Sequence, residues 1–229
     1  CCRNELSLHL MQPVVYYCYD AYCGWCYGFS PVMKQLAAAY RDRISFEVLS
    51  GGMIPAENPR HIGAMAGYIS EAYKRVEELT GIRFGEDYLW HILHPDQSDW
   101  FPHSEKASIA LCILKEWLPD RQPELAAALQ YALHYEGRDL TDDEAYRHLL
   151  QQYQLDETAF YQKLHSEEYR DKAHYEFALC RQLQANGFPH VLISAGENKF
   201  YLLARGYTDY DTLKQRLDNV LAEIETTAT

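Results

Sequence analysis

Residues 13–26, PVVYYCYDAYCGWC, form the stretch that decides the fold of this chain. Its first part, 13–19, is a short apolar run of β-branched and aromatic residues with a proline at its edge, which is typical of a fully buried strand. From Cys26 to Tyr40 the apolar residues follow a helical spacing instead. The sequence therefore predicts a strand, then a turn that carries two cysteines, then a helix.

The Cys-Gly-Trp-Cys motif of Cys23 and Cys26 lies at this predicted turn. Disulfide exchange needs two sulfurs that can bond to each other, one of them reactive. At the start of a helix, unpaired backbone amides and the positive end of the helix dipole stabilise a thiolate. The motif predicts Cys23 as the catalytic nucleophile and Cys26, one turn further along the helix, as the catalytic resolving thiol.

A zinc site is the alternative role for such a cysteine pair. Structural zinc usually has four ligands, often from a second close pair, and this chain has no second Cys-x-x-Cys. The other candidate ligands are His91, His94, Cys112 and Cys180. A purely structural disulfide is also disfavoured, because it would close a very small loop. We therefore predict no metal site.

Further from the motif, the chain divides into two α/β ends and a helical middle. Residues 44–49 alternate as a second strand, 190–194 and 199–204 are predicted as a hairpin, and 208–225 as an amphipathic helix. Residues 55–185 are almost entirely helical in pattern. Because the end pieces cannot bury a sheet unless they pair with each other, the middle is predicted to be an insertion into one α/β domain.

Three short segments resemble a known family: DAYCGWC at 20–26, GFP at 187–189 and GRDL at 137–140. They are similar to the DsbA-like branch of the thioredoxin superfamily, and within it to the FrnE-like protein-disulfide isomerase group. The resemblance covers nearly all of residues 13–225. It implies an α/β protein with a thioredoxin-like fold and a large all-helical insertion.

The domain boundaries follow from the same division of the chain. The thioredoxin-like domain is expected to be discontinuous, over residues 11–54 and 186–226, around the helical insertion at 55–185. Residues 1–10 are predicted to be an extension or a cloning remnant.

The resemblance also implies a cis peptide bond before Pro189, facing the cysteine pair. In such proteins the backbone before this proline pairs with a bound peptide as an added strand. Phe188 would offer its backbone, Pro189 would shape the groove, and His190 would affect its selectivity. Trp25, between the two sulfurs, is predicted to line the same substrate-binding surface.

Proton transfer from the resolving thiol is the open point of this interpretation. Many relatives have a buried acid six residues before the first cysteine, and this chain has Tyr17 there. Asp20 is the nearer candidate. It either assists proton transfer through water or only caps the turn.

The composition of the chain argues against two classes of binding partner. The 229 residues have a formal net charge of −12, which disfavours a nucleic acid or an anionic membrane surface. No apolar run approaches the ~18 residues of a membrane helix, and no signal peptide is recognised. We expect a cytoplasmic protein that needs no cofactor.

These observations predict a thiol–disulfide oxidoreductase that acts on protein or peptide disulfides and dithiols. In a reducing compartment it would work as a reductase or isomerase, with a thiol electron donor or acceptor as second partner. Two alternatives stay open. One is a glutathione-dependent isomerase or transferase of the 2-hydroxychromene-2-carboxylate isomerase or kappa-class type. The other is a non-catalytic peptide-binding module.

Overall fold

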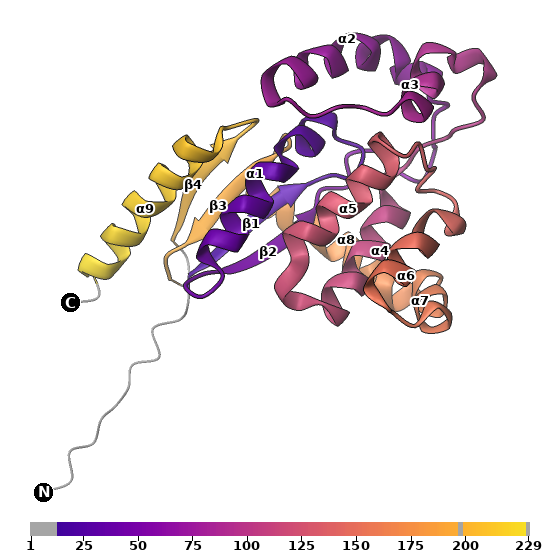
Figure 1. Ribbon diagram of the computed structural model, residues 1–229. Coiled ribbons are helices and arrows are strands. Elements are labelled where there is room, and N and C mark those ends of the chain that lie inside the picture. The colour runs from indigo at the N-terminus through magenta and orange to yellow at the C-terminus, as the bar shows by residue number, and fades with distance from the viewer. Residues whose placement is uncertain (1–12, 197–198, 228–229) are drawn as a thin grey trace, which may run out of the picture.

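The computed structural model describes residues 13–196 and 199–227, and at its centre lies a four-stranded mixed sheet (Figure 1). The strand order is β2–β1–β3–β4. β1 pairs in parallel with β2 and antiparallel with β3, which pairs antiparallel with β4. The strands are β1 (Val14–Tyr19), β2 (Ser45–Ser50), β3 (His190–Ser194) and β4 (Phe200–Arg205).

Each predicted strand is confirmed within one residue at either end. The two ends of the chain pair through β1 and β3, as the division into end pieces and a middle required. Residues 197–198, between the two strands of the predicted hairpin, lie outside the described residues. The predicted extension at 1–10 and residues 11–12 of the predicted domain lie outside them too.

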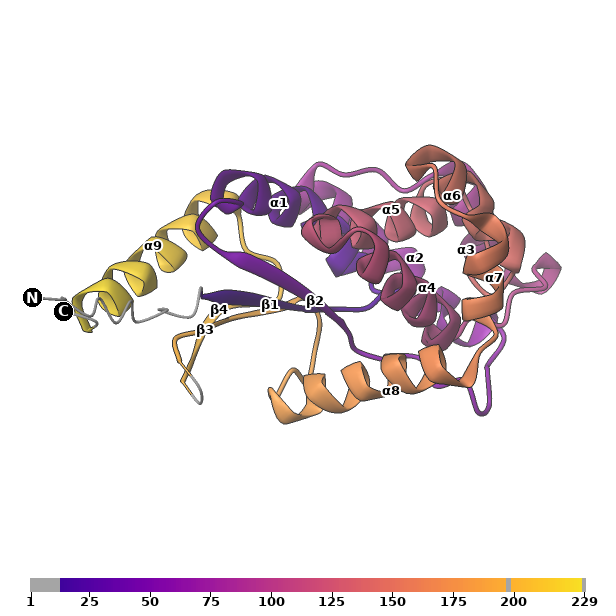
Figure 2. The same ribbon diagram turned by 90° about the horizontal axis from the view of Figure 1, so that it is seen from below.

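Helices cover both faces of the sheet (Figure 2). α1 (Gly24–Tyr40) and α9 (Tyr210–Thr227) lie on one face, and α8 (Glu167–Gln182) lies on the opposite one. By sequence α8 belongs to the predicted insertion, but it packs directly against β2. Within the described residues, no helix combines the length and the apolar character that crossing a membrane would require.

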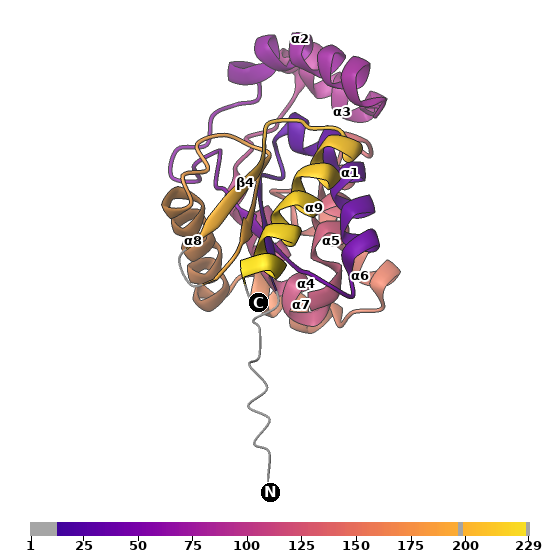
Figure 3. The same cartoon turned by 90° about the vertical axis from the view of Figure 1, so that its left-hand side faces the viewer.

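The remaining helices come from the middle of the chain. α2 and α3 lie at the end of the molecule where α1 begins, and α4 to α7 gather beside the sheet (Figures 1 and 3). Short 3-10 turns connect some of them, at Pro95–Gln97, Pro119–Arg121 and Asp143–Tyr146. These helices are α2 (Gly63–Thr80), α3 (Glu86–Leu93), α4 (Ser104–Trp117), α5 (Gln122–His134), α6 (Arg147–Tyr153) and α7 (Glu157–Leu164).

The side chains of β1 alternate between the two faces of the sheet, as the period of a strand requires. Tyr17 faces α1, where its ring centroid is 5.9 Å from that of Phe29. Cys18 faces the other way and packs with Leu49 and Cys180 in a small buried cluster beneath α8. The helix of the Cys-x-x-Cys motif, α1, therefore packs on the face of the sheet that carries Tyr17.

Gly28 brings α2 close to the first turns of α1. A Cβ at Gly28 would lie 2.7 Å from Val76 Cγ1 and 2.9 Å from Thr80 Cγ2, closer than real contacts allow. The absence of a side chain at Gly28 therefore lets the C-terminal half of α2 rest on α1, near the two cysteines.

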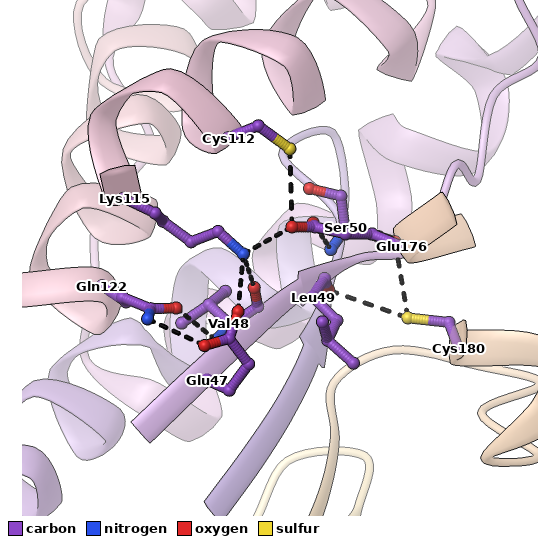
Figure 4. Close-up of polar contacts among 9 residues, drawn as sticks. All are labelled: Glu47, Val48, Leu49, Ser50, Cys112, Lys115, Gln122, Glu176 and Cys180. Carbon is purple, nitrogen blue, oxygen red and sulfur yellow. Dashed lines mark hydrogen bonds and ion pairs between the residues drawn. The ribbon is translucent and has the colours of Figure 1, made fainter. Parts of the chain in front are cut away.

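A buried ion pair joins α4, α8 and β2 (Figure 4). Lys115 Nζ lies 2.5 Å from Glu176 Oε1 and 3.0 Å from Glu47 Oε1, and it donates to the carbonyl oxygen of Val48. Glu176 also accepts from the backbone N–H of Ser50 at 2.8 Å. Burial opposes the charge of Lys115, but Glu176 and Glu47 overcome this and raise its pKa. The network fixes the insertion helices to the sheet edge by charge as well as by packing.

Candidate functional site

Cys23 is the N-cap residue of α1, directly after the turn that follows β1. Its backbone is extended, with φ −82° and ψ 108°, and its N–H donates to the carbonyl oxygen of Asp20 at 3.1 Å. Cys23 is 7% exposed, whereas Cys26, one turn into the helix, is 0% exposed. The sequence prediction of a Cys-x-x-Cys motif at a strand-to-helix turn is confirmed in its geometry.

The two thiols differ in acidity. The pKa of Cys23 is lowered, chiefly by a hydrogen bond from the Cys26 thiol and further by the N–H groups of Cys26 and Trp25, against the opposing effects of burial and of Asp20. Burial raises the pKa of Cys26 well above its ordinary value, and its hydrogen bond to Cys23 acts in the same direction. The outer sulfur is therefore the one that ionises first.

Phe188 and Pro189 lie beside the outer sulfur. The peptide bond between them is cis, as the resemblance implied. The Cys23 thiol donates a hydrogen bond to the carbonyl oxygen of Phe188 at 3.5 Å, across 165 positions of sequence. The Phe188 ring lies over Gly51, where a Cβ would come within 1.9 Å of it. Seating the ring on Gly51 leaves the Phe188 carbonyl beside Cys23.

The other two predicted substrate residues lie nearby in different surroundings. His190 opens β3, pairs with Cys18 of β1 and Arg205 of β4, and is buried. Burial lowers the pKa of His190, and the Arg205 guanidinium lowers it further. Trp25 is partly buried and lines a cavity that also includes Cys23. A role in substrate binding stays a prediction for both.

Asp20 is fully buried, and hydrogen bonds reach its carboxylate from three directions. Oδ1 accepts from the N–H of Tyr22 at 3.0 Å and from Ser104 Oγ at 2.9 Å, while Oδ2 accepts from the N–H of Met53 at 2.7 Å. Burial raises the pKa of Asp20, and these hydrogen bonds moderate the shift. The contacts favour the second of its two predicted roles, that of holding the turn in place.

Two residues of α5 that the sequence analysis did not single out support the same turn from the other side. Gln130 Nε2 donates to the carbonyl oxygen of Asp20 at 3.2 Å, and His134 Nε2 bonds to that of Ala21 at 3.1 Å. Both side chains are buried. Their i, i+4 spacing beside the apolar stripe of Leu129 is the sequence signal that could have identified them.

His134 gives the protein a specific sensitivity to acid. Burial lowers its pKa to about 3, against an unfolded value near 6.5. Between these values the unfolded chain binds the extra proton, so the contribution of His134 to the unfolding free energy is fully present above about pH 6.5 and falls by roughly 1.4 kcal/mol per pH unit below it. We expect His134→Gln to reduce the slope of unfolding free energy against pH by about one proton. Urea titrations at pH 7, 5.5 and 4.5 measure this slope, and an unchanged slope would contradict the assignment.

Two of the cavities in the described part of the molecule lie near the N-terminal half of α1. One, of ≈ 470 Å³, lies between α1, α5 and α6, and its walls include charged residues such as Lys34 and Glu136 but neither motif cysteine. The other, of ≈ 350 Å³, has Cys23 and Trp25 in its wall and is lined on another side by α2. Of these two cavities, the second is the one that adjoins the Cys-x-x-Cys motif.

Three of the four other candidate zinc ligands, His91, Cys112 and Cys180, make side-chain hydrogen bonds to other groups. His91 bonds to Ser98 Oγ and stacks on Trp100. The Cys112 thiol donates to Glu176, and that of Cys180 to backbone carbonyls of β2 (Figure 4). Within residues 13–196 and 199–227, no group of three or more His, Cys, Asp or Glu side chains is arranged to hold a metal ion.

Solved structures of other proteins have the same fold as this chain. A structure of a proposed protein disulfide isomerase from Nitrosomonas europaea is 22% identical, with a TM-score of 0.81 over 93% of this chain and 98% of that one. The cytosolic disulfide reductase DsbM from Pseudomonas aeruginosa is 26% identical, with a TM-score of 0.72 over 91% and 98%. A second DsbM structure, with GSH, has a TM-score of 0.68.

More distant neighbours share the fold alone. A 2-hydroxychromene-2-carboxylate isomerase is 12% identical, with a TM-score of 0.60 over 94% of this chain and 97% of that one. No curated protein matches the sequence. The family model of the DSBA-like thioredoxin domain matches residues 14–218, which spans β1 through the first half of α9. With its sheet, its flanking helices and its helical insertion, the chain belongs to the DSBA-like thioredoxin domain family.

Proposed function

We propose that this protein is a thiol–disulfide oxidoreductase that exchanges disulfides with protein substrates through Cys23 and Cys26, as a reductase or isomerase. One observation carries the proposal. The sulfur whose pKa is lowered is also the more exposed one, and it lies 3.5 Å from the Phe188 carbonyl oxygen. A nucleophile and a backbone edge that can pair with a peptide thus meet at one point.

The reaction follows from the difference between the two thiols. The Cys23 thiolate attacks one sulfur of a substrate disulfide, forms a Cys23–substrate disulfide, and expels the second substrate sulfur, which takes up a proton. Cys26 then loses its proton and attacks Cys23. This step forms the Cys23–Cys26 disulfide and releases the remaining substrate thiol. Two electrons pass to the substrate, and an external thiol donor must reduce the Cys23–Cys26 pair again.

Glutathione is the thiol donor that the comparisons favour. The DsbM neighbour is a cytosolic disulfide reductase, and one of its structures holds GSH. In a cytoplasm buffered by such thiols, the Cys23–Cys26 pair would be kept reduced, and reduction or isomerisation would be the net direction. In the alternative of a glutathione-dependent isomerase, turnover would not depend on Cys26, and this distinguishes it from the proposed two-cysteine reaction. A binding module would hold peptides without either cysteine.

The Cys26→Ser variant tests the proposed order of attack. Without the resolving thiol, the Cys23–substrate disulfide cannot be released from within the protein, so we expect it to accumulate. Incubation with a disulfide-bonded protein, followed by non-reducing electrophoresis and mass spectrometry, should show an adduct at Cys23. The Cys23→Ser variant is the matched control and should form none. Adducts of equal yield in both variants would refute the assignment of roles.

A further inference from the structure

The larger of the two cavities, of ≈ 470 Å³, lies outside the proposed disulfide exchange, because neither motif cysteine lines it. It is found where α1 and α5 pack side by side (Figures 1 and 2), and α6 and the loop after α2 complete its wall. Its volume falls in the range of pockets that hold small molecules. The side chains of its wall therefore indicate which class of small molecule it can bind.

Two side chains of α1 line this cavity without a partner in the described part of the chain. Ser30 is 6% exposed, and its hydroxyl makes no hydrogen bond with another described residue. Lys34 is exposed, and within residues 13–196 and 199–227 it makes neither a hydrogen bond nor an ion pair. Because the two residues lie four positions apart in one helix, they are neighbours on the same face. A buried hydroxyl and an ammonium group can therefore both donate to one anion.

The other charged groups of the wall already have partners of opposite charge. The pairs are Glu124–Arg121 at 2.6 Å, Glu136–Arg138 at 2.6 Å and Arg83–Glu77 at 2.9 Å. Arg121 is the chief cause of the lowered pKa of Glu124, and Lys34 acts in the same direction without forming an ion pair. Burial lowers the pKa of His148, which leaves this lining residue uncharged at pH 7. The uncompensated charge of the wall is therefore positive and lies at Lys34.

Tyrosine rings form much of the remaining wall. Tyr131 and Tyr135, at the end of α5, stack on each other with ring centroids 4.7 Å apart and an interplanar angle of 18°. Each of them is 44% exposed. Tyr27 and Tyr153 line the cavity from α1 and α6. A planar aromatic ring gains contact with such ring faces and edges, whereas a compact inorganic anion does not.

We propose that this cavity binds a small aromatic carboxylate, whose anionic group accepts hydrogen bonds from Ser30 and Lys34 and whose ring packs against the tyrosines. The site is separate from the cysteine pair in its residues, and it needs no thiol. Because Ser30 is buried, its hydroxyl gains a partner there that water in the open solvent does not provide.

The test measures the binding of 2-naphthoate at pH 7 by isothermal titration calorimetry. Two matched probes separate the contributions: 2-naphthamide keeps the ring without the charge, and cyclohexanecarboxylate keeps the charge without an aromatic ring. We expect 2-naphthoate to bind with a Kd at least about 5-fold lower than that of either probe. Ser30→Ala and Lys34→Met should each weaken the binding of 2-naphthoate, and Lys34→Met should also remove its advantage over 2-naphthamide.

Ala128→Phe locates the binding, because it fills this cavity from α5 and should abolish it. Ala72→Phe is the matched control, since it makes the same substitution in the wall of the cavity beside Cys23 and should leave the Kd unchanged. Lys74→Met, at an exposed lysine of α2 outside the cavity, should leave it unchanged as well.

Three results would each overturn the inference. They are a lack of 2-naphthoate binding, equal affinity for 2-naphthoate and 2-naphthamide, and an unchanged Kd in both Ser30→Ala and Lys34→Met. A loss of binding in Ala72→Phe but not in Ala128→Phe would assign the ligand to the other cavity and would overturn it too. None of these results bears on disulfide exchange, which the cysteine variants test separately.

Discussion

Replacement of Cys23 by serine is expected to lower the rate of disulfide reduction at least about 1,000-fold. A serine hydroxyl is not ionised at neutral pH, so the variant lacks the thiolate that must attack the substrate. The surroundings at the start of α1 lower the pKa of the Cys23 thiol, but they do not make a serine hydroxyl ionise at neutral pH. Turbidity from insulin reduction by dithiothreitol, followed for wild type and variant at equal concentration, measures the loss.

Cys112→Ser provides the matched control for this substitution. Cys112 is also a buried free thiol, but it lies on α4 and donates to Glu176, a hydrogen bond that serine can replace. We expect this variant to keep the wild-type rate. Insulin reduction by Cys23→Ser at the wild-type rate would remove the chemical basis of the proposed function.

Lys115→Met is expected to cost about 3–5 kcal/mol of unfolding free energy. Both Lys115 and Glu176 are buried, so loss of the ammonium group leaves the carboxylate of Glu176 without its counter-charge in a medium that solvates it poorly. The carbonyl oxygen of Val48 loses a donor at the same time. Urea unfolding monitored by tryptophan fluorescence measures the change in stability.

The double variant Lys115→Met with Glu176→Gln separates charge from packing. A glutamine can still accept from the Ser50 N–H but carries no charge, so the double variant should be more stable than Lys115→Met alone. Arg43→Met is the surface comparison. Its pair with Glu225 is 56% and 71% exposed, and such pairs contribute under about 1 kcal/mol. A Lys115→Met cost as small as that of Arg43→Met would show that the buried pair is not needed for stability.

The acid sensitivity expected of His134 concerns the turn that leads from β1 to Cys23. His134 and Gln130 bond to its carbonyl groups from α5, and Asp20 bonds to neighbouring N–H groups. These contacts hold the turn before Cys23 in place without touching its sulfur. Substitutions there are expected to change how well the nucleophile is positioned.

Local spacing along the chain determined where the cysteine motif lies. A run of β-branched and aromatic residues, a turn, and a helical repeat are properties of neighbouring residues, so β1, the start of α1 and the Cys23–Cys26 pair were predictable without tertiary contacts. The resemblance to a family added the cis bond before Pro189, which spacing alone does not reveal.

Tertiary packing alone decided what surrounds the motif. The Phe188 carbonyl reaches Cys23 across 165 positions, and Gln130 reaches Asp20 across 110. The cavity beside Cys23 and Trp25 depends on how α2 rests on α1 at Gly28, and the Lys115–Glu176 pair depends on how α4 and α8 meet. A sequence pattern reports which face of an element is apolar, but the distance between two faces is set by the packing of all the side chains between them.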